Sequence, residues 1–468
     1  MVSEPAWLGL GEAAALIAER MLSPVELTEA LLARIAALEP QLNAFVRIEA
    51  ESALAEARRA EAEAARGELR GPLHGVPFGL KDIIDAAGLP TTAHSKLLMQ
   101  SPPAETDAFV AARLKAAGGI LIGKMATHEF AIGGPSFDLP WPPARNPWNP
   151  GTMPGGSSSG SGAAVAAGLM AGALGSDTGG SVRNPASSCA IVGLKPTYGR
   201  VSRRGVLPLS FSLDHVGPLT RGVADNALML GVIAGHDPAD PGSARVPVPD
   251  FAVGLDHGVR GCRIGVIRHF FERDIEAAPE MAAALEAALQ VLAGLGAEIV
   301  EIETRPLQEY AACNRVILLS EAFAIHRKWL SERPEDYAVS TRERLLPGAF
   351  FSAGDYVDAL RARRRIAAEF EVLIQPYDAV ITASAMDTPL AIDDAEAIAR
   401  AYSRQARAPF NLTGSPALAM PAGFSSDGLP LSLQIVGKQF DEAGVYRVAA
   451  AYEAATPWKD MHPPMAAF

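Results

Sequence analysis

The stretch PGGSSSGSG at residues 154–162 and the stretch SDTGGS at residues 176–181 organise the chain. Both are rich in Gly and Ser, yet apolar residues follow the first at 163–169 and lead into the second at 171–175. A flexible linker would lie between domains and continue into polar sequence. We therefore interpret the two stretches as loops in which Gly lets backbone N–H groups approach a ligand and Ser supplies hydroxyl groups.

Neither stretch has the spacing of a nucleotide-binding loop. No Gly-Lys-Ser/Thr follows the first stretch, which excludes a P-loop, and the G-x-G-x-x-G spacing of a dinucleotide fingerprint is missing. Residues 178–181 instead place consecutive backbone N–H groups beside the hydroxyl of Ser181. This arrangement is typical of an oxyanion hole next to a serine nucleophile, and such a serine needs a base.

Further motifs follow the order that is found in a known enzyme family. GVPFGLKD lies upstream at 75–82, and VRNPA at 182–186, GLKPTYGR at 193–200 and PFNLTGSPA at 409–417 lie downstream. Together with the two stretches above, these motifs resemble the amidase signature family, from residue 22 to residue 464. The resemblance implies the α/β fold of that family, a central mixed β-sheet covered by helices on both faces.

The resemblance also implies a catalytic triad of two serines and a lysine. Ser181 matches the nucleophile, Ser157 the bridging serine and Lys81 the base, while Ser158 matches a supporting position. The bond between Gly156 and Ser157 matches a cis peptide bond. An ammonium group cannot accept a proton, so the pKa of Lys81 must fall well below its usual value of about 10.4. Burial lowers the pKa of a lysine in this way.

Residues around the nucleophile are expected to support the reaction. The resemblance implies that the backbone N–H groups of Thr178, Gly179 and Gly180 hold the oxyanion, together with that of the nucleophile itself. Asp177 and Arg183 flank the nucleophile. We interpret them as a structural ion pair that fixes the loop, because supporting side chains keep such turns in place.

Other catalytic chemistries have weaker support. His215 follows an aspartate and would suit a Ser-His-Asp triad, but no Gly-x-Ser-x-Gly elbow occurs in a strand–turn–helix context, so we expect it to brace a turn. His128-Glu129 lacks the second histidine of a zinc-protease motif. The nine histidines show no ligand spacing, so we predict no metal and no cofactor. A non-catalytic binding module on this fold is a further alternative, which the presence of all three triad residues disfavours.

The composition indicates a globular protein that binds neither nucleic acid nor a membrane. Of the 468 residues, 49% are hydrophobic and 20% charged, and the net charge is −12 without a basic patch. No uncharged run has the length of a membrane span, and the N-terminus lacks the basic region of a signal peptide. Cys189, Cys262 and Cys313 are far apart and odd in number, which predicts free thiols, a reducing compartment and a cytoplasmic location.

Helix and strand patterns alternate along the chain. Residues 23–26, SPVE, have the pattern of a capping box and start a helix that runs to about residue 38. Helix-then-strand pairs are expected at 106–117 with 120–123, at 280–292 with 298–302 and at 357–373 with 379–381, and Thr106 or Asp107 should cap the first of these helices. We expect an N-terminal helical arm at residues 1–70 and a catalytic core at residues 71–468. The arm is a candidate surface for a homodimer.

The segments expected to border the site are apolar or aromatic. Phe130, Ile132, Gly133 and Phe137 are the candidate substrate-binding residues, and few charges interrupt them, so a neutral hydrophobic or aryl group should bind better than a charged one. We therefore predict a stand-alone serine hydrolase of small amides. Aryl esters and aryl carbamates (urethanes) are further candidate substrates, because their attack passes through the same tetrahedral oxyanion.

The resemblance extends to the glutaminase component of glutamyl-tRNA amidotransferase, which needs partner subunits. In that component an acidic residue before the C-terminal block helps to hold the ammonium group of glutamine. Residues 402–407, YSRQAR, contain no acidic residue, and a basic segment suits an ammonium group poorly. The sequence therefore favours the stand-alone hydrolase, and the glutaminase component of an amidotransferase is its alternative.

Overall fold

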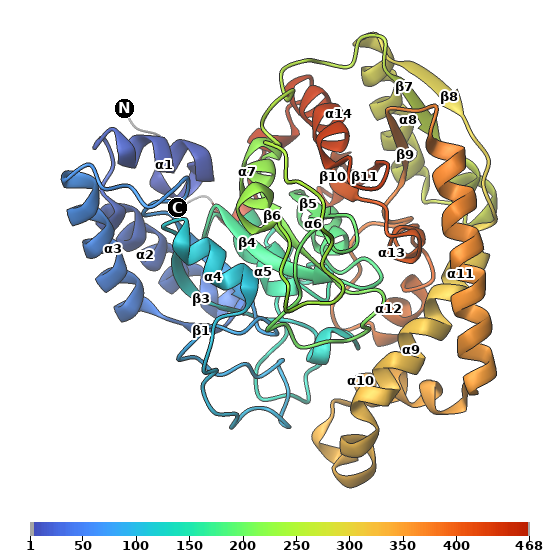
Figure 1. The fold of residues 1–468 in the computed structure, drawn as a ribbon, viewed down its shortest axis with the longest axis horizontal. Helices are drawn as coiled ribbons and strands as arrows, with labels where there is room; N and C mark the ends of the chain where they lie inside the picture. Colours follow the sequence, from blue (N-terminus) through green and yellow to red (C-terminus); the bar gives the residue numbers. More distant parts are fainter. Residues whose placement is uncertain (1–3, 467–468) are drawn as a thin grey trace.

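One mixed sheet of 11 strands runs through the centre of the computed structural model (Figure 1). The structure describes residues 4–466. In space the strands follow the order β1-β3-β2-β4-β6-β5-β10-β11-β9-β7-β8. Their bounds are β1 Phe45–Ile48, β2 Pro77–Lys81, β3 Ile120–Met125, β4 Gly172–Asp177, β5 Val192–Lys195, β6 His215–Thr220, β7 Arg263–Val266, β8 Glu298–Glu301, β9 Ala379–Ala383, β10 Ala417–Phe424 and β11 Pro430–Val436.

The pairing of β2 with β4 brings two of the predicted catalytic motifs together. The two strands are parallel, with Leu80 opposite Leu174, and the carboxyl ends of parallel strands meet at one edge of a sheet, where ligands usually bind. Lys81, the last residue of β2, therefore lies beside Ser176 and Asp177, the last residues of β4. On its other side β4 pairs antiparallel with β6, so the sheet is mixed, as the sequence predicts.

Helices cover both faces of this sheet, which confirms the predicted α/β class. α5 packs on β2, β4 and α6, whereas α7 and α8 pack on the sheet together with α14. The long helices α9 and α11 pack side by side at the end of the molecule far from α1, α2 and α3 (Figure 1). The helices are α1 Leu10–Ala18, α2 Pro24–Leu42, α3 Ala50–Ala65, α4 Phe109–Ala116, α5 Ser159–Ala166, α6 Arg183–Cys189, α7 Val223–Ile233, α8 Pro279–Gly294, α9 Leu307–Glu332, α10 Val339–Leu345, α11 Ala353–Ile374, α12 Ala395–Ala401, α13 Ala408–Thr413 and α14 Glu442–Ala454.

The predicted helix cap is right for α2 and wrong for α4. The Ser23 hydroxyl accepts from the N–H groups of Val25 and Glu26, and the Glu26 carboxylate accepts from the Ser23 N–H, which completes the capping box. α4 begins at Phe109 without a side-chain cap. Asp107 instead accepts from the Ala87 N–H and pairs with a lysine one turn inside the helix, so its carboxylate is engaged in two other interactions.

The segment expected to form an arm contributes a strand to the central sheet. β1 pairs antiparallel with β3 at its edge, and α3 buries a face of small side chains, Ala53, Ala57, Ala60 and Ala64. Buried alanines allow close approach of α3 to α2, against which it packs. The division at residue 70 and the homodimer stay predictions.

The described helices and cysteines bear on the predicted location. Within residues 4–466, no helix combines the length and the apolar character that crossing a bilayer requires. The three cysteines are buried free thiols. Residues 1–3, on which the expected absence of a signal peptide partly depends, lie outside the described part of the chain.

Candidate active site

Lys81 lies at the buried centre of the site. Its ammonium nitrogen donates to Ser157 Oγ at 2.7 Å and to Ser176 Oγ at 2.9 Å. Both partners are hydroxyl groups, whereas the other buried lysine of this edge, Lys124, pairs with Asp82 at 2.9 Å. Burial lowers the pKa of Lys81 to about 7, against the opposing effect of nearby aspartates. A substantial fraction of Lys81 is therefore neutral near neutral pH, as a general base requires.

The loop at 154–162 presents Ser157 to this lysine. The peptide bond between Gly156 and Ser157 is cis, as expected. The His128 ring packs so closely on Gly156 that a Cβ added there would clash with the ring, which explains the glycine. The His128 N–H donates to the Ser157 carbonyl at 3.0 Å, so this histidine supports the loop from the backbone and from the ring.

Ser158 joins the two Gly- and Ser-rich stretches. Its hydroxyl donates to the Ser176 carbonyl and accepts from the Ser176 N–H, both at 3.2 Å. Its own N–H donates to the Ser181 carbonyl at 3.3 Å. The side chain and the backbone of one residue thus fix the distance between the loop of Ser157 and the turn of Ser181.

Asp177 organises the turn that carries Ser181. Its carboxylate accepts from the Gly180 N–H at 2.8 Å and from the Val182 N–H at 3.1 Å, and it pairs with Arg183 at 2.9 Å. The structural ion pair that the sequence suggests is therefore present. The expectation for Gly180 needs a correction, because its N–H is engaged by the carboxylate and does not point to a free oxyanion site.

Arg183 connects this turn to the C-terminal part of the chain. It is fully buried and donates to Asn411 Oδ1 and Gln434 Oε1, each at 2.7 Å. The Asn411 amide in turn donates to Asp177 Oδ1 at 2.8 Å. Burial by itself raises the pKa of Asp177, but the opposite charge of Arg183 and the hydrogen bonds outweigh it and lower the pKa. Asp177 is therefore ionised throughout the physiological range.

Sequence reasoning missed the roles of Asn411 and Gln434. Asn411 belongs to the motif at 409–417, whose polar residue within an apolar context was a usable signal. Gln434 is the one amide side chain in β11, PLSLQIV, which is buried along its whole length. A polar side chain in a fully buried strand must find partners, so this position also carried a signal.

Replacing Asp177 with asparagine should destabilise the protein. The change leaves the Arg183 guanidinium buried without its anion, and breaking a buried pair in this way costs about 3–5 kcal/mol. Thermal unfolding should therefore show a clear loss of stability. Asp358→Asn is the matched control, because Asp358 pairs with Arg361 on the exposed face of α11. Equal melting temperatures of Asp177→Asn and the control would contradict the role of this network.

His215 acts in the structure as a brace for a turn. Its Nδ1 lies 2.7 Å from the Leu213 carbonyl and 3.2 Å from that of Asp177, so the ring is engaged with the backbone on the side of β6. The preceding residue, Asp214, accepts from the Thr178 hydroxyl at 2.6 Å, which fixes the start of the nucleophile turn. Among residues 4–466, no three potential His, Cys, Asp or Glu ligands are grouped as a metal site.

The expected aromatic wall is largely a packing cluster. The Phe130 side chain is only 2% exposed and packs on His326, Trp329 and Tyr337. The prediction that Phe130 binds substrate is therefore wrong, because its side chain completes an aromatic core between the loop and α9.

The other three candidate residues of this segment differ in their surroundings. The Ile132 side chain is buried, and the Gly133 carbonyl accepts from the Tyr402 hydroxyl at 2.5 Å. Phe137 is 57% exposed at the surface. Their roles in substrate binding stay predictions.

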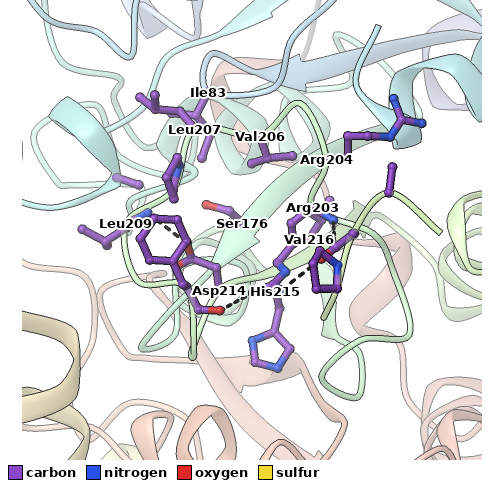
Figure 2. Close-up of a pocket in the computed structure, with 16 residues that line it drawn as sticks. Ile83, Ser176, Arg203, Arg204, Val206, Leu207, Leu209, Asp214, His215 and Val216 are labelled. Atoms are coloured by element: carbon purple, nitrogen blue, oxygen red, sulfur yellow. Dashed lines mark hydrogen bonds and ion pairs between the residues drawn. The ribbon is translucent and has the colours of Figure 1, made fainter. Parts of the chain in front are cut away.

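Two cavities lie near the nucleophile turn. The larger, of about 260 Å³, reaches Ser176 and Asp214 and is bordered by the segment that carries Arg203 and Arg204 (Figure 2). The smaller, of about 60 Å³, is lined by Asn184, Tyr402, Arg404, Arg407 and the loop at 385–390. Asn184 follows Ser181 by three residues and donates to the Gly156 carbonyl at 3.2 Å, so the smaller cavity borders both catalytic loops.

Comparisons with known proteins agree with the fold and the motifs. The model of the Amidase family matches residues 26–446. The glutamyl-tRNA(Gln) amidotransferase component of Chloroflexus aggregans that is designated by the letter A is 40% identical, over 99% of this chain and 100% of the relative. Further relatives at 38–40% identity carry the same description.

Solved structures extend the same similarity. The native peptide amidase from Stenotrophomonas maltophilia has a TM-score of 0.86 at 32% identity and covers 97% of this chain and 98% of its own. A bacterial aryl acylamidase of the amidase signature family has a TM-score of 0.87 at 25% identity, with the same coverage. The chain is therefore a member of the amidase signature family, an amidase-type enzyme that acts on carbon–nitrogen bonds.

Proposed function

We propose that this chain hydrolyses amides through an acyl-enzyme on Ser181. The observation that supports this best is the buried contact of Lys81 Nζ with Ser157 Oγ at 2.7 Å, together with a lysine pKa of about 7. A lysine that only stabilised the fold would be expected beside a carboxylate, as Lys124 is beside Asp82. A neutral amine that faces a serine hydroxyl is instead equipped to accept a proton.

The proposed reaction moves one proton along the triad in each half. Neutral Lys81 accepts the proton of Ser157 Oγ, and Ser157 accepts that of Ser181 Oγ while this oxygen attacks the carbonyl carbon. The carbonyl electron pair moves to the oxygen, and backbone N–H groups of the turn stabilise the oxyanion. The C–N bond then breaks, and the proton returns through Ser157 to the leaving amine. Water repeats these steps on the acyl-enzyme and releases the acid.

The N–H groups available for the oxyanion are fewer than the sequence suggests. Because Asp177 engages the Gly180 N–H, we assign this role to the N–H groups of Thr178, Gly179 and Ser181. Aryl amides belong to the proposed substrates. Aryl esters and aryl carbamates (urethanes) are included, because attack on their carbonyl gives the same tetrahedral oxyanion.

The second candidate function is the glutaminase component of an amidotransferase. The curated relatives favour this function over a stand-alone hydrolase, because those at 38–40% identity are all described as the same component of glutamyl-tRNA(Gln) amidotransferase. The chemistry of the smaller cavity counts against it. Arg404 lies in the segment where an acid would hold the glutamine ammonium group, and it binds Asp387 at 2.6 and 2.9 Å. The carboxylate nearest to that position is thus already neutralised.

A substrate panel on the purified chain separates the two candidates. We expect hydrolysis of a 4-nitroanilide and of an aryl carbamate without partner proteins, and poor turnover of glutamine. Glutaramate is the matched control, because it lacks only the α-ammonium group of glutamine and should be hydrolysed at least as fast. Glutamine turnover that exceeds that of glutaramate, and that rises when the other amidotransferase components are added, would establish the glutaminase function instead.

A further inference from the structure

A buried guanidinium beside the nucleophile turn has an unused donor. Arg407 precedes α13 and is 7% exposed. Its Nη1 donates to the Ser384 carbonyl at 2.9 Å, and its own carbonyl accepts from Arg183 at 2.8 Å. Its Nε has no hydrogen-bond partner among residues 4–466. Buried donors nearly always have partners, and exceptions point to a missing ligand or water.

The free donor lies against the residue that precedes Ser181. A Cβ added to Gly180 would lie 2.6 Å from Arg407 Nε. Gly180 also has a φ of +131°, which favours glycine, so both the backbone and the close approach require a glycine here. The guanidinium therefore packs directly on the turn, and it lines the smaller cavity together with Asn184 and Tyr402.

The charges around this cavity leave Arg407 without a dedicated anion. Arg404 and Asp387 neutralise each other through two hydrogen bonds. Asp177, on the far side of the turn, is paired with Arg183. Burial and the proximity of Arg183 lower the pKa of Arg407 to about 9, which reflects a cation that has lost water without gaining a direct carboxylate partner.

We propose that Arg407 is a specificity-determining residue that binds a carboxylate on the acyl part of the substrate. The inference rests on the proposed acyl-enzyme, because the acyl part stays bonded to Ser181, next to Gly180, throughout the reaction. The substrate class is then the monoamides of short dicarboxylic acids, including their anilides. This replaces the expectation of a neutral acyl group, which depended in part on the aromatic residue that the structure places in the core.

The test compares matched charged and uncharged substrates. Wild-type kcat/KM for the mono-4-nitroanilide of succinic acid should exceed that for the 4-oxopentanoyl anilide, in which a methyl ketone replaces the carboxylate. The expected factor is about 10- to 100-fold, the range for a hydrogen bond to a charged group. The malonyl and glutaryl homologues are measured as well, because chain length sets the distance between the carboxylate and Ser181.

Variants assign this preference to one side chain. Arg407→Gln should bring the ratio of the two kcat/KM values close to one, and Arg407→Lys should retain part of it because the charge remains. Arg400→Gln should leave the ratio unchanged, since Arg400 lies exposed on α12 and pairs with Glu396. A preference for the neutral anilide at all three chain lengths would overturn the inference, and so would an equal loss of both activities in Arg407→Gln.

A binding measurement decides the inference even if no anilide is hydrolysed. That outcome would reject the proposed function, and calorimetric titration of the Ser181→Ala variant with succinamate and with 4-oxopentanamide then tests Arg407 alone. Tighter binding of succinamate that the added Arg407→Gln change removes supports the carboxylate site. Equal binding of the two amides rejects it.

Discussion

Replacing Ser181 with alanine should lower kcat for anilide hydrolysis by on the order of 10⁴- to 10⁶-fold, the loss typical of a removed serine nucleophile. The change removes one oxygen atom from a turn whose geometry depends on Asp177 and Arg183, so the fold should persist. Stopped assays measure the residual rate. Intact mass spectrometry after treatment with a fluorophosphonate should show one adduct in the wild type and none in the variant.

A control serine makes the result specific. Ser403→Ala removes an exposed hydroxyl that donates to the Arg400 carbonyl, and it should leave both the rate and the labelling unchanged. Peptide mapping that places the adduct on a serine other than Ser181, or a Ser181→Ala variant that retains labelling, would reject the assigned nucleophile.

Replacing Lys81 with methionine should lower kcat/KM by about 10²- to 10⁴-fold, the contribution expected of a general base. The wild type should also lose activity at low pH. Because burial lowers the pKa of Lys81 to about 7, the neutral form increases as pH rises through this value. The plot of kcat/KM against pH should therefore rise between about pH 6 and pH 8 with a midpoint near 7.

Lys115→Met is the control for this experiment. Lys115 pairs with Asp107 in a partly exposed position, so its loss should change neither the rate nor the pH profile. A wild-type rate that is flat between pH 6 and pH 8, or a Lys81→Met variant with nearly normal turnover, would reject the lysine as the base.

The elements that depend on local patterns could be predicted from the sequence. The capping box at Ser23 starts α2, and the helix-then-strand patterns at 280–302 and 357–381 correspond to α8 with β8 and to α11 with β9. Lys81 could be placed at a strand end for the same reason. These predictions succeed because capping and periodicity are determined by residues close to one another in the chain.

The features that failed depend on contacts between distant segments. The N–H of Gly180 appears free in the sequence, because nothing local shows that the Asp177 side chain turns back to accept from it. Phe130 follows two charged or titratable residues and resembles a loop aromatic, but α9 supplies the rings that bury it. Arg407 could be noted as basic, yet only the tertiary structure places its Nε against the nucleophile turn.

The hydrogen bonds of Arg183 have a consequence for the biosynthesis of the enzyme. Asn411 and Gln434 follow Arg183 by 228 and 251 residues. A nascent chain therefore contains Lys81, Ser157 and Ser181 long before the ribosome has delivered the partners that complete the nucleophile turn. Premature termination before Asn411 yields a polypeptide with every triad residue and an unfinished turn, so hydrolytic activity in a cell reports translation almost to the end of the message.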